Sequence, residues 1–227
     1  MSDRATTAAE HLLPRLLSEL LGTAALVCVV VGSGIMGENL AAGNAGVALL
    51  VNALATVFAL YVLITVFGPV SGAQFNPVVT LAARFDGAFG WGETVARIAA
   101  QTTGALGGAV IANLMFDYPA MELSNHARDS APEYLSEVVA TAGLLFVIHA
   151  LLRTHRGSLI PTCVAAYIGA AYFFTSSTSF ANPAVTIGRT ITDTFSGISP
   201  ADAPTFIAMQ CIGAAVGHLS ARLLFPD

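Results

Sequence analysis

The sequence predicts an all-α integral membrane protein in which six transmembrane helices and two re-entrant half-helices form an inverted repeat. Three observations predict this fold. The chain is very apolar, because 55% of its 227 residues are hydrophobic and only 10% are charged, with a mean hydropathy of +0.73. Six of its stretches are long enough to cross a bilayer, and its two halves share three sequence segments. A soluble domain carries about 25% charged residues, so this chain has too few to cover a water-facing surface.

The six predicted spans follow from the lengths of the apolar stretches, since a spanning helix needs about 20 predominantly apolar residues. They cover residues 13–33, 44–67, 93–115, 133–152, 159–179 and 203–225. The polar start of the chain precedes a first apolar stretch that is itself long enough to span, so no cleavable signal is expected.

The arginines predict the orientation of the spans. The chain has no lysine, and six spans place both termini on one side together with seven of the nine arginines, Arg4 among them. Only Arg128 and Arg189 fall on the opposite side. Because basic residues favour the cytoplasm, we expect both termini to be cytoplasmic, in a multi-pass protein of the cell inner (plasma) membrane.

The two halves of the chain repeat three segments in the same order. S-E-L-L-G-T-A-A-L at 18–26 matches S-E-V-V-A-T-A-G-L at 136–144, F-N-P-V-V-T matches A-N-P-A-V-T, and Q-T-T-G-A-L-G-G at 101–108 matches Q-C-I-G-A-A-V-G at 210–217. We therefore expect one domain, residues 1–227, with repeats at about 13–116 and 133–226. Each repeat holds an odd number of spans, so the second copy lies upside down relative to the first.

Each repeat carries an Asn-Pro pair that predicts the start of a half-helix. Asparagine is a strong N-cap and proline is favoured at the first helical position. The runs 76–84 and 182–191 are too short to span, so each is expected to re-enter the membrane from one side. Inverted symmetry then brings the two positive helix ends together at mid-membrane, where a cation meets a barrier and a neutral solute finds hydrogen-bond partners.

The two boxes S-G-A-Q-F-N-P-V-V-T and S-F-A-N-P-A-V-T, in six spans with a glutamate in the first and fourth, resemble the aquaporin (major intrinsic protein) family. The resemblance implies a homotetramer of channels, each protomer with its own pore. It also implies two pore motifs, formed by Asn76, Pro77, Val78, Asn182, Pro183 and Ala184.

Two further sets of residues follow from the resemblance. Glu19 and Glu137 would brace the re-entrant loops, although a carboxylate within a span could instead relay protons in an ion-coupled secondary transporter. The backbone carbonyl groups expected to line the pore belong to Gly72, Ala73, Gln74, Phe75, Thr178, Ser179, Phe180 and Ala181.

The family's selectivity filter is where this sequence departs from most relatives. Counting by the family's spacing, the filter is expected at Thr56, Ala170, Ser179 and Val185, with valine in place of the usual arginine and Arg189 a full turn further along. A filter of small, uncharged residues is wide, and the valine resembles a bacterial subgroup associated with trivalent arsenic, As(OH)3. We therefore expect passage of water, glycerol-like polyols and metalloid hydroxides; a water-selective channel is the alternative.

Other function classes are disfavoured by the same sequence. No basic patch exists to bind nucleic acid. Serine, histidine and acidic residues form no recognisable catalytic or metal-binding constellation, so we expect no enzyme activity, no metal site and no cofactor. His149, within a span, is expected to be a hydrogen-bonded interior histidine. The expected partners are membrane lipid, small neutral solutes and further copies of the chain.

Overall fold

The computed structural model describes residues 2–226, with side chains described from Leu12 onward, and the predicted all-helical fold is confirmed. Within these described residues, six helices are long and apolar enough to cross a membrane. The helices of the first half are α1 (Ser2–Leu40), α2 (Ala45–Ser71), α3 (Pro77–Phe85) and α4 (Trp91–Met115). Those of the second half are α5 (Ala131–Arg153), η1 (Gly157–Leu159), α6 (Ile160–Phe174), α7 (Pro183–Gly188), η2 (Arg189–Ile191) and α8 (Ala203–Leu224).

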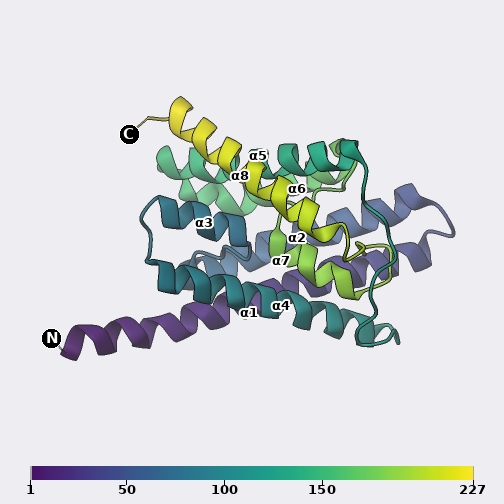
Figure 1. Ribbon diagram of the computed structural model, residues 1–227, viewed down its shortest axis with the longest axis horizontal. Coiled ribbons are helices and arrows are strands. Elements are labelled where there is room, and N and C mark those ends of the chain that lie inside the picture. The colour runs from purple at the N-terminus through teal and green to yellow at the C-terminus, as the bar shows by residue number, and fades with distance from the viewer. Residues whose placement is uncertain (1, 227) are drawn as a thin grey trace.

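Both chain termini lie at the same end of the molecule, and α1 and α5 run in opposite directions along its long axis (Figure 1). We call the end with the termini the terminal end and the opposite end the far end. Arg4, one of the arginines that predicted the orientation, lies outside the described side chains.

The two half-helices α3 and α7 begin where the Asn-Pro pairs predicted. Asn76 and Asn182 are N-caps in extended conformation, and each proline occupies the first helical turn. The side-chain oxygen of Asn76 accepts a hydrogen bond from the backbone N–H of Val78, and that of Asn182 accepts from Ala184 and Val185. These bonds satisfy backbone donors that would otherwise be unpaired at membrane depth.

Close packing of α4 on α1 and of α8 on α5 forms the frame around the half-helices. A Cβ atom added to Gly108 would lie 2.2 Å from the carbonyl oxygen of Ala24 in α1, and one added to Gly217 would lie 2.0 Å from that of Ala142 in α5. Only glycine permits these approaches, which is the general role of small residues at helix contacts within membranes. The repeated segments 101–108 and 210–217 therefore hold the same place in the two halves.

The connection between α4 and α5 is anchored to the loop after η2 at the far end. Asp193 accepts hydrogen bonds from the backbone N–H of Asn125 at 2.9 Å and from its side-chain amide at 3.2 Å. These bonds lower the pKa of the Asp193 carboxyl below its ordinary value. The connection thereby carries Arg128 over the far end of the helix bundle.

Candidate functional site

Glu19 lies in the middle of α1 and holds the extended segment before α3 in place. Its carboxylate is fully buried and accepts hydrogen bonds from the backbone N–H groups of Gln74 and Phe75, at 3.1 and 2.7 Å. The side chains of Ser71 and Gln101 also donate to it, at 2.6 and 2.8 Å. A buried carboxylate needs partners of this kind, so Glu19 links three helices to one loop.

Glu137 repeats this arrangement in the second half. It accepts hydrogen bonds from the backbone N–H groups of Phe180 and Ala181, both at 2.9 Å. Ser177 and Gln210 donate to it at 2.6 and 2.7 Å, as Ser71 and Gln101 do to Glu19. One partner of Glu19 has no counterpart at Glu137. The guanidinium of Arg97 lies 3.6 Å from Glu19, and no arginine forms such an ion pair with Glu137 among the described side chains.

The two extended segments hold strained backbone that these glutamates stabilise. Ala73 and Phe75 have φ angles of 47° and 49°, and Ser179 and Ala181 have φ angles of 56° and 48°. Residues other than glycine rarely adopt this left-handed region, at a cost of roughly 1–3 kcal/mol each. This backbone keeps residues 72–75 and 179–181 out of a helix, and these residues line the internal cavity.

Asn76 and Asn182 join the two half-helices at the centre of the molecule. The side-chain amide of Asn76 donates to the carbonyl oxygen of Ala181 at 2.8 Å, and that of Asn182 donates to the carbonyl oxygen of Phe75 at 2.7 Å. An amide has two N–H groups, and the structure gives each asparagine one such bond among the described residues. Both side chains line the internal cavity, so the second N–H of each is available to a molecule inside it.

A cavity of about 320 Å³ passes between these two asparagines and extends toward both ends of the bundle. One side is polar, because residues 72–75 and 179–181 line it together with the asparagines. Thr178 does not line the cavity, unlike the seven other residues of the two extended segments expected to do so. The remaining wall is apolar and follows the repeat, with Leu26 matched by Leu144 and Val30 by Ile148.

Three of the four residues expected to form the filter line this cavity, namely Thr56, Ser179 and Val185. The placement of Ala170 is wrong: its side chain is exposed on the outside of α6, and Tyr172 lines the cavity instead. Ala170 was placed by counting twelve residues back from Asn182, and the residue that lines the cavity lies two positions later in α6, which ends at Phe174. Two residues turn a helix by about 200°, which carries Ala170 to the opposite face.

Tyr172 introduces an aromatic ring that the predicted filter lacks. Its hydroxyl oxygen lies 3.1 Å from that of Thr56, which itself donates to the carbonyl oxygen of Asn52 at 2.9 Å. Since the Thr56 proton is already engaged, Tyr172 is the donor of the pair. Val185 is buried and lines the same cavity, whereas Val78, the third residue of the first motif, is buried without lining it.

Arg189 also lines the cavity, although its distance in sequence from Val185 argued against a place in the filter. Its guanidinium carbon lies 3.4 Å from the ring centroid of Phe180, and its Nε donates to the carbonyl oxygen of Ser196. Arg128 approaches the same ring, with its guanidinium carbon 4.9 Å from the centroid. Both arginines are buried, and no described carboxylate lies within ion-pair distance of either. The far end of the cavity is therefore positively charged.

Comparison with known proteins places this geometry among membrane channels. Residues 6–181 match the sequence profile of the family described as Major intrinsic protein. The chain is 47% identical over 200 residues to the aquaglyceroporin AqpS of Rhizobium meliloti (strain 1021), across 88% of this chain and 85% of that protein. It is 26% identical over 212 residues to the probable aquaporin NIP7-1 of Arabidopsis thaliana, across 91% and 74% of the two chains.

The fold is also similar to a solved structure. The X-ray structure of the aquaglyceroporin from Plasmodium falciparum matches with a TM-score of 0.73 and 18% sequence identity, across 95% of this chain and 98% of that chain. The two chains thus share their overall fold.

Proposed function

Because the chain belongs to the major intrinsic protein family, we propose that it is a passive transmembrane channel for water and small uncharged, glycerol-like solutes. The observation that carries this proposal is the cavity that passes between Asn76 and Asn182. Each of these side chains is held by the opposite half of the molecule and presents one N–H to the cavity. Fixed donors and carbonyl acceptors along one wall replace the hydration of a polar solute.

The chemistry of the wall supports polyols and neutral metalloid hydroxides as well as water. A polyol places its hydroxyl groups on the polar side of the cavity and its carbon atoms against the apolar side, which Leu26, Val30, Leu144 and Ile148 contribute to. As(OH)3 is uncharged and carries hydroxyl groups in a similar arrangement. Val185 removes the bulk and the charge that an arginine would place beside Ser179 and Thr56. We therefore extend the proposal to trivalent arsenic hydroxide.

Tyr172 is the specific observation that favours the alternative, a water-selective channel. Its ring lines the cavity, whereas the sequence predicted an alanine for the filter, and its hydroxyl oxygen lies 3.1 Å from that of Thr56. A ring at this place narrows the passage, so its effect opposes that of Val185. An ion-coupled transporter is less well supported, because the carboxylates of Glu19 and Glu137 are each engaged by four hydrogen bonds.

Electrostatics supports exclusion of cations. The N-termini of α3 and α7 meet at the centre, and their dipoles present partial positive charge to the cavity. Arg189 and Arg128 add positive charge at the far end. We further propose a homotetramer in the plasma membrane with both termini in the cytoplasm, as the family resemblance and the arginine distribution suggest.

The proposal is tested in proteoliposomes that contain the wild type, Val185→Arg or the uncharged control Val185→Leu. Water and glycerol permeability are measured by stopped-flow light scattering, and arsenite by tracer uptake. We expect the wild type to pass all three, Val185→Arg to lose glycerol and arsenite while it retains water, and Val185→Leu to retain most glycerol flux. A wild type that passes water alone would establish the water-selective alternative, and one that passes nothing would contradict the channel itself.

A further inference from the structure

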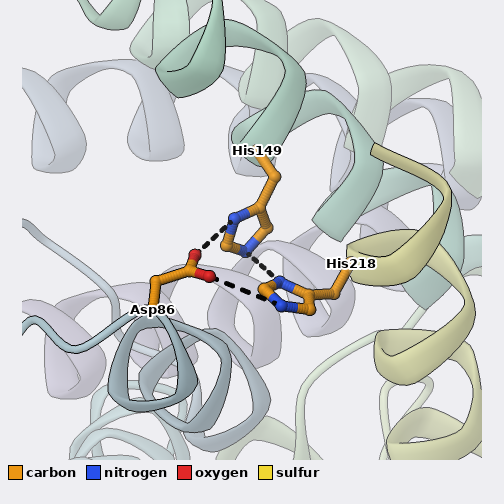
Figure 2. Close-up of side chains that lie close together, drawn as sticks. All are labelled: Asp86, His149 and His218. Atoms are coloured by element: carbon orange, nitrogen blue, oxygen red, sulfur yellow. Dashed lines mark hydrogen bonds and ion pairs between the residues drawn. The ribbon is translucent and has the colours of Figure 1, made fainter. Parts of the chain in front are cut away.

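Three side chains from three different helices converge at the terminal end of the cavity (Figure 2). Asp86 follows the last residue of α3, His149 lies in α5 and His218 lies in α8. Nδ1 of His149 is 3.1 Å from one carboxylate oxygen of Asp86, and Nε2 of His218 is 3.5 Å from the other. The two imidazole rings also face each other, with Nδ1 of His218 3.4 Å from Nε2 of His149.

The donor set and its spacing are those of a transition-metal site. One ligand atom from each residue can be chosen so that all three lie within 4.8 Å of one another. Zn²⁺ binds imidazole nitrogen and carboxylate oxygen at about 2.0–2.2 Å, so neighbouring ligand atoms in a tetrahedral site are about 3.3–3.6 Å apart. The 3.1 and 3.5 Å separations involve the two different oxygens of Asp86, so an ion would draw the three ligand atoms together from the 4.8 Å within which they lie. Two imidazoles and one carboxylate also leave the fourth position of a tetrahedral ion open.

The carboxylate of Asp86 attracts a positive ion and gives it access, although the positive charge of Arg153 also acts on His149. Asp86 is the C-cap of α3, so the partial negative charge at the C-terminal end of this helix lies beside its carboxylate. The Asp86 side chain is 35% exposed, whereas those of His149 and His218 are only 5% and 10% exposed. An ion can therefore arrive through the exposed carboxylate and be held by histidines whose positions are fixed by the packing of α5 against α8.

The cluster also belongs to the wall of the solute path. Asp86 and His149 line the cavity, together with Leu152 and Ile160 at the same end. An ion held by them would place its open coordination position, and the water bound there, in the opening. Such an ion obstructs passage without contact with the filter at the far end.

We infer that Asp86, His149 and His218 form a binding site for a divalent transition metal of the Zn²⁺ class, and that occupation of this site reduces solute flux. The binding site stands on its own geometry, whereas the effect on flux rests on the proposed channel function. If the ion binds Nδ1 of His149 and Nε2 of His218, the other nitrogen of each ring carries a proton. These two nitrogens, Nε2 of His149 and Nδ1 of His218, lie 3.4 Å apart and cannot both donate to each other, so one ring must turn. The ring of His149 lines the cavity and can donate its N–H to water there.

The binding site is tested with purified full-length protein in detergent, by isothermal titration calorimetry with ZnCl₂ and with MgCl₂ as the ion control. Mg²⁺ prefers six oxygen ligands and should give no signal above the blank. We expect Zn²⁺ to bind the wild type at one site per chain. His218→Gln and Asp86→Asn should weaken this affinity by at least about tenfold, since even supporting residues of metal sites contribute 10–100-fold. His155→Asn, which changes an exposed histidine in the loop after α5, should bind as the wild type does.

The effect on flux is measured in proteoliposomes with ZnCl₂ or MgCl₂ in the buffers on both sides of the membrane, and then with EDTA. We expect Zn²⁺ to reduce wild-type glycerol and water flux several-fold and EDTA to restore it, while the Zn²⁺ to Mg²⁺ flux ratio of His218→Gln stays near one.

The outcomes separate the two proposals. Equal Zn²⁺ affinity in the wild type, His218→Gln and Asp86→Asn would overturn the site. The site would also be overturned if both variants failed to fold and the wild type bound no Zn²⁺. The three residues would then serve only to hold the end of α3 in place through hydrogen bonds. Binding without any change in flux would overturn the regulatory effect alone. A wild type that binds Zn²⁺ but passes no solute would contradict the channel and not the metal site.

Discussion

The hydroxyl group of Tyr172 lies 3.1 Å from that of Thr56, which joins α6 to α2 across the far end of the cavity. The ring of Tyr172 lines the same cavity as Val185, so we expect it to limit the size of the solutes that pass. We predict that Tyr172→Ala raises the permeability of a five-carbon polyol such as xylitol several-fold relative to water. Stopped-flow swelling measures both. Tyr172→Phe keeps the ring and should leave the ratio near the wild-type value; an unchanged ratio in Tyr172→Ala would contradict the placement.

Arg189 supplies positive charge at the far end of the cavity, where the motif itself carries Val185. We predict that Arg189→Gln raises the proton permeability of proteoliposomes at least several-fold, because a cation then meets a lower electrostatic barrier. Pyranine fluorescence under an imposed potassium diffusion potential reports the leak. Arg156→Gln, which changes an exposed arginine in the loop after α5, is the control. A leak that is equal in all three proteins would show that the half-helix dipoles suffice.

Glu19 and Glu137 stabilise the strained loops through equivalent hydrogen bonds. In Glu19→Gln, an amide NH₂ replaces a carboxylate oxygen among N–H donors, so at least one of the bonds from Gln74, Phe75 or Gln101 is lost. Hydrogen bonds to charged groups contribute about 1.5–3 kcal/mol each, so we expect destabilisation of several kcal/mol.

Thermal unfolding in detergent, followed by size-exclusion fluorescence, measures this effect. Glu137→Gln should behave like Glu19→Gln, and Glu38→Gln, which changes an exposed residue near the end of α1, should melt as the wild type does. Equal melting of all four proteins would contradict the bracing role.

Gly108 and its neighbour Gly107 provide a matched pair for the contact between α4 and α1. A Cβ atom at Gly108 would lie 2.2 Å from the carbonyl oxygen of Ala24, whereas one at Gly107 meets nothing within 4 Å. We predict that Gly108→Ala destabilises the protein by about 1–3 kcal/mol, as overpacking does, and that Gly107→Ala has little effect. The same unfolding assay checks this, and similar losses for both variants would show that glycine is needed for flexibility rather than for contact.

The spans and half-helices could be predicted from the sequence because their signals are local. An N-cap asparagine and a first-turn proline specify the start of α3 and of α7 whatever surrounds them. The glutamates were also identifiable, because a carboxylate within a span needs a partner and the family resemblance implies that these two brace the loops. The partners of Glu19 are known only from the structure, because Ser71, Gln74 and Gln101 lie 52 or more residues from it in the sequence.

The filter was harder to predict, because it depends on the length of a loop. Val185 and Ser179 are adjacent to Asn182, and both line the cavity. Ala170 was reached by counting back through residues 175–182 with the family's spacing, and the structure places Tyr172, two residues later, on the cavity. Arg189 was given no place in the filter because it lies a full helical turn beyond Val185. Its long side chain nevertheless reaches the cavity. Asp86, His149 and His218 come from three helices and share no spacing that could have linked them.

The reciprocal bonds of Asn76 and Asn182 have a consequence for biosynthesis. The acceptor for the Asn76 amide is Ala181, which lies 105 residues later in the chain. At about 5–20 residues per second, a ribosome needs roughly 5–20 s to produce that acceptor. During this interval the first half-helix has its capping asparagine but not the partner that fixes it. The centre of the molecule can therefore close only after Ala181 and Asn182 have been made, late in the second half of synthesis.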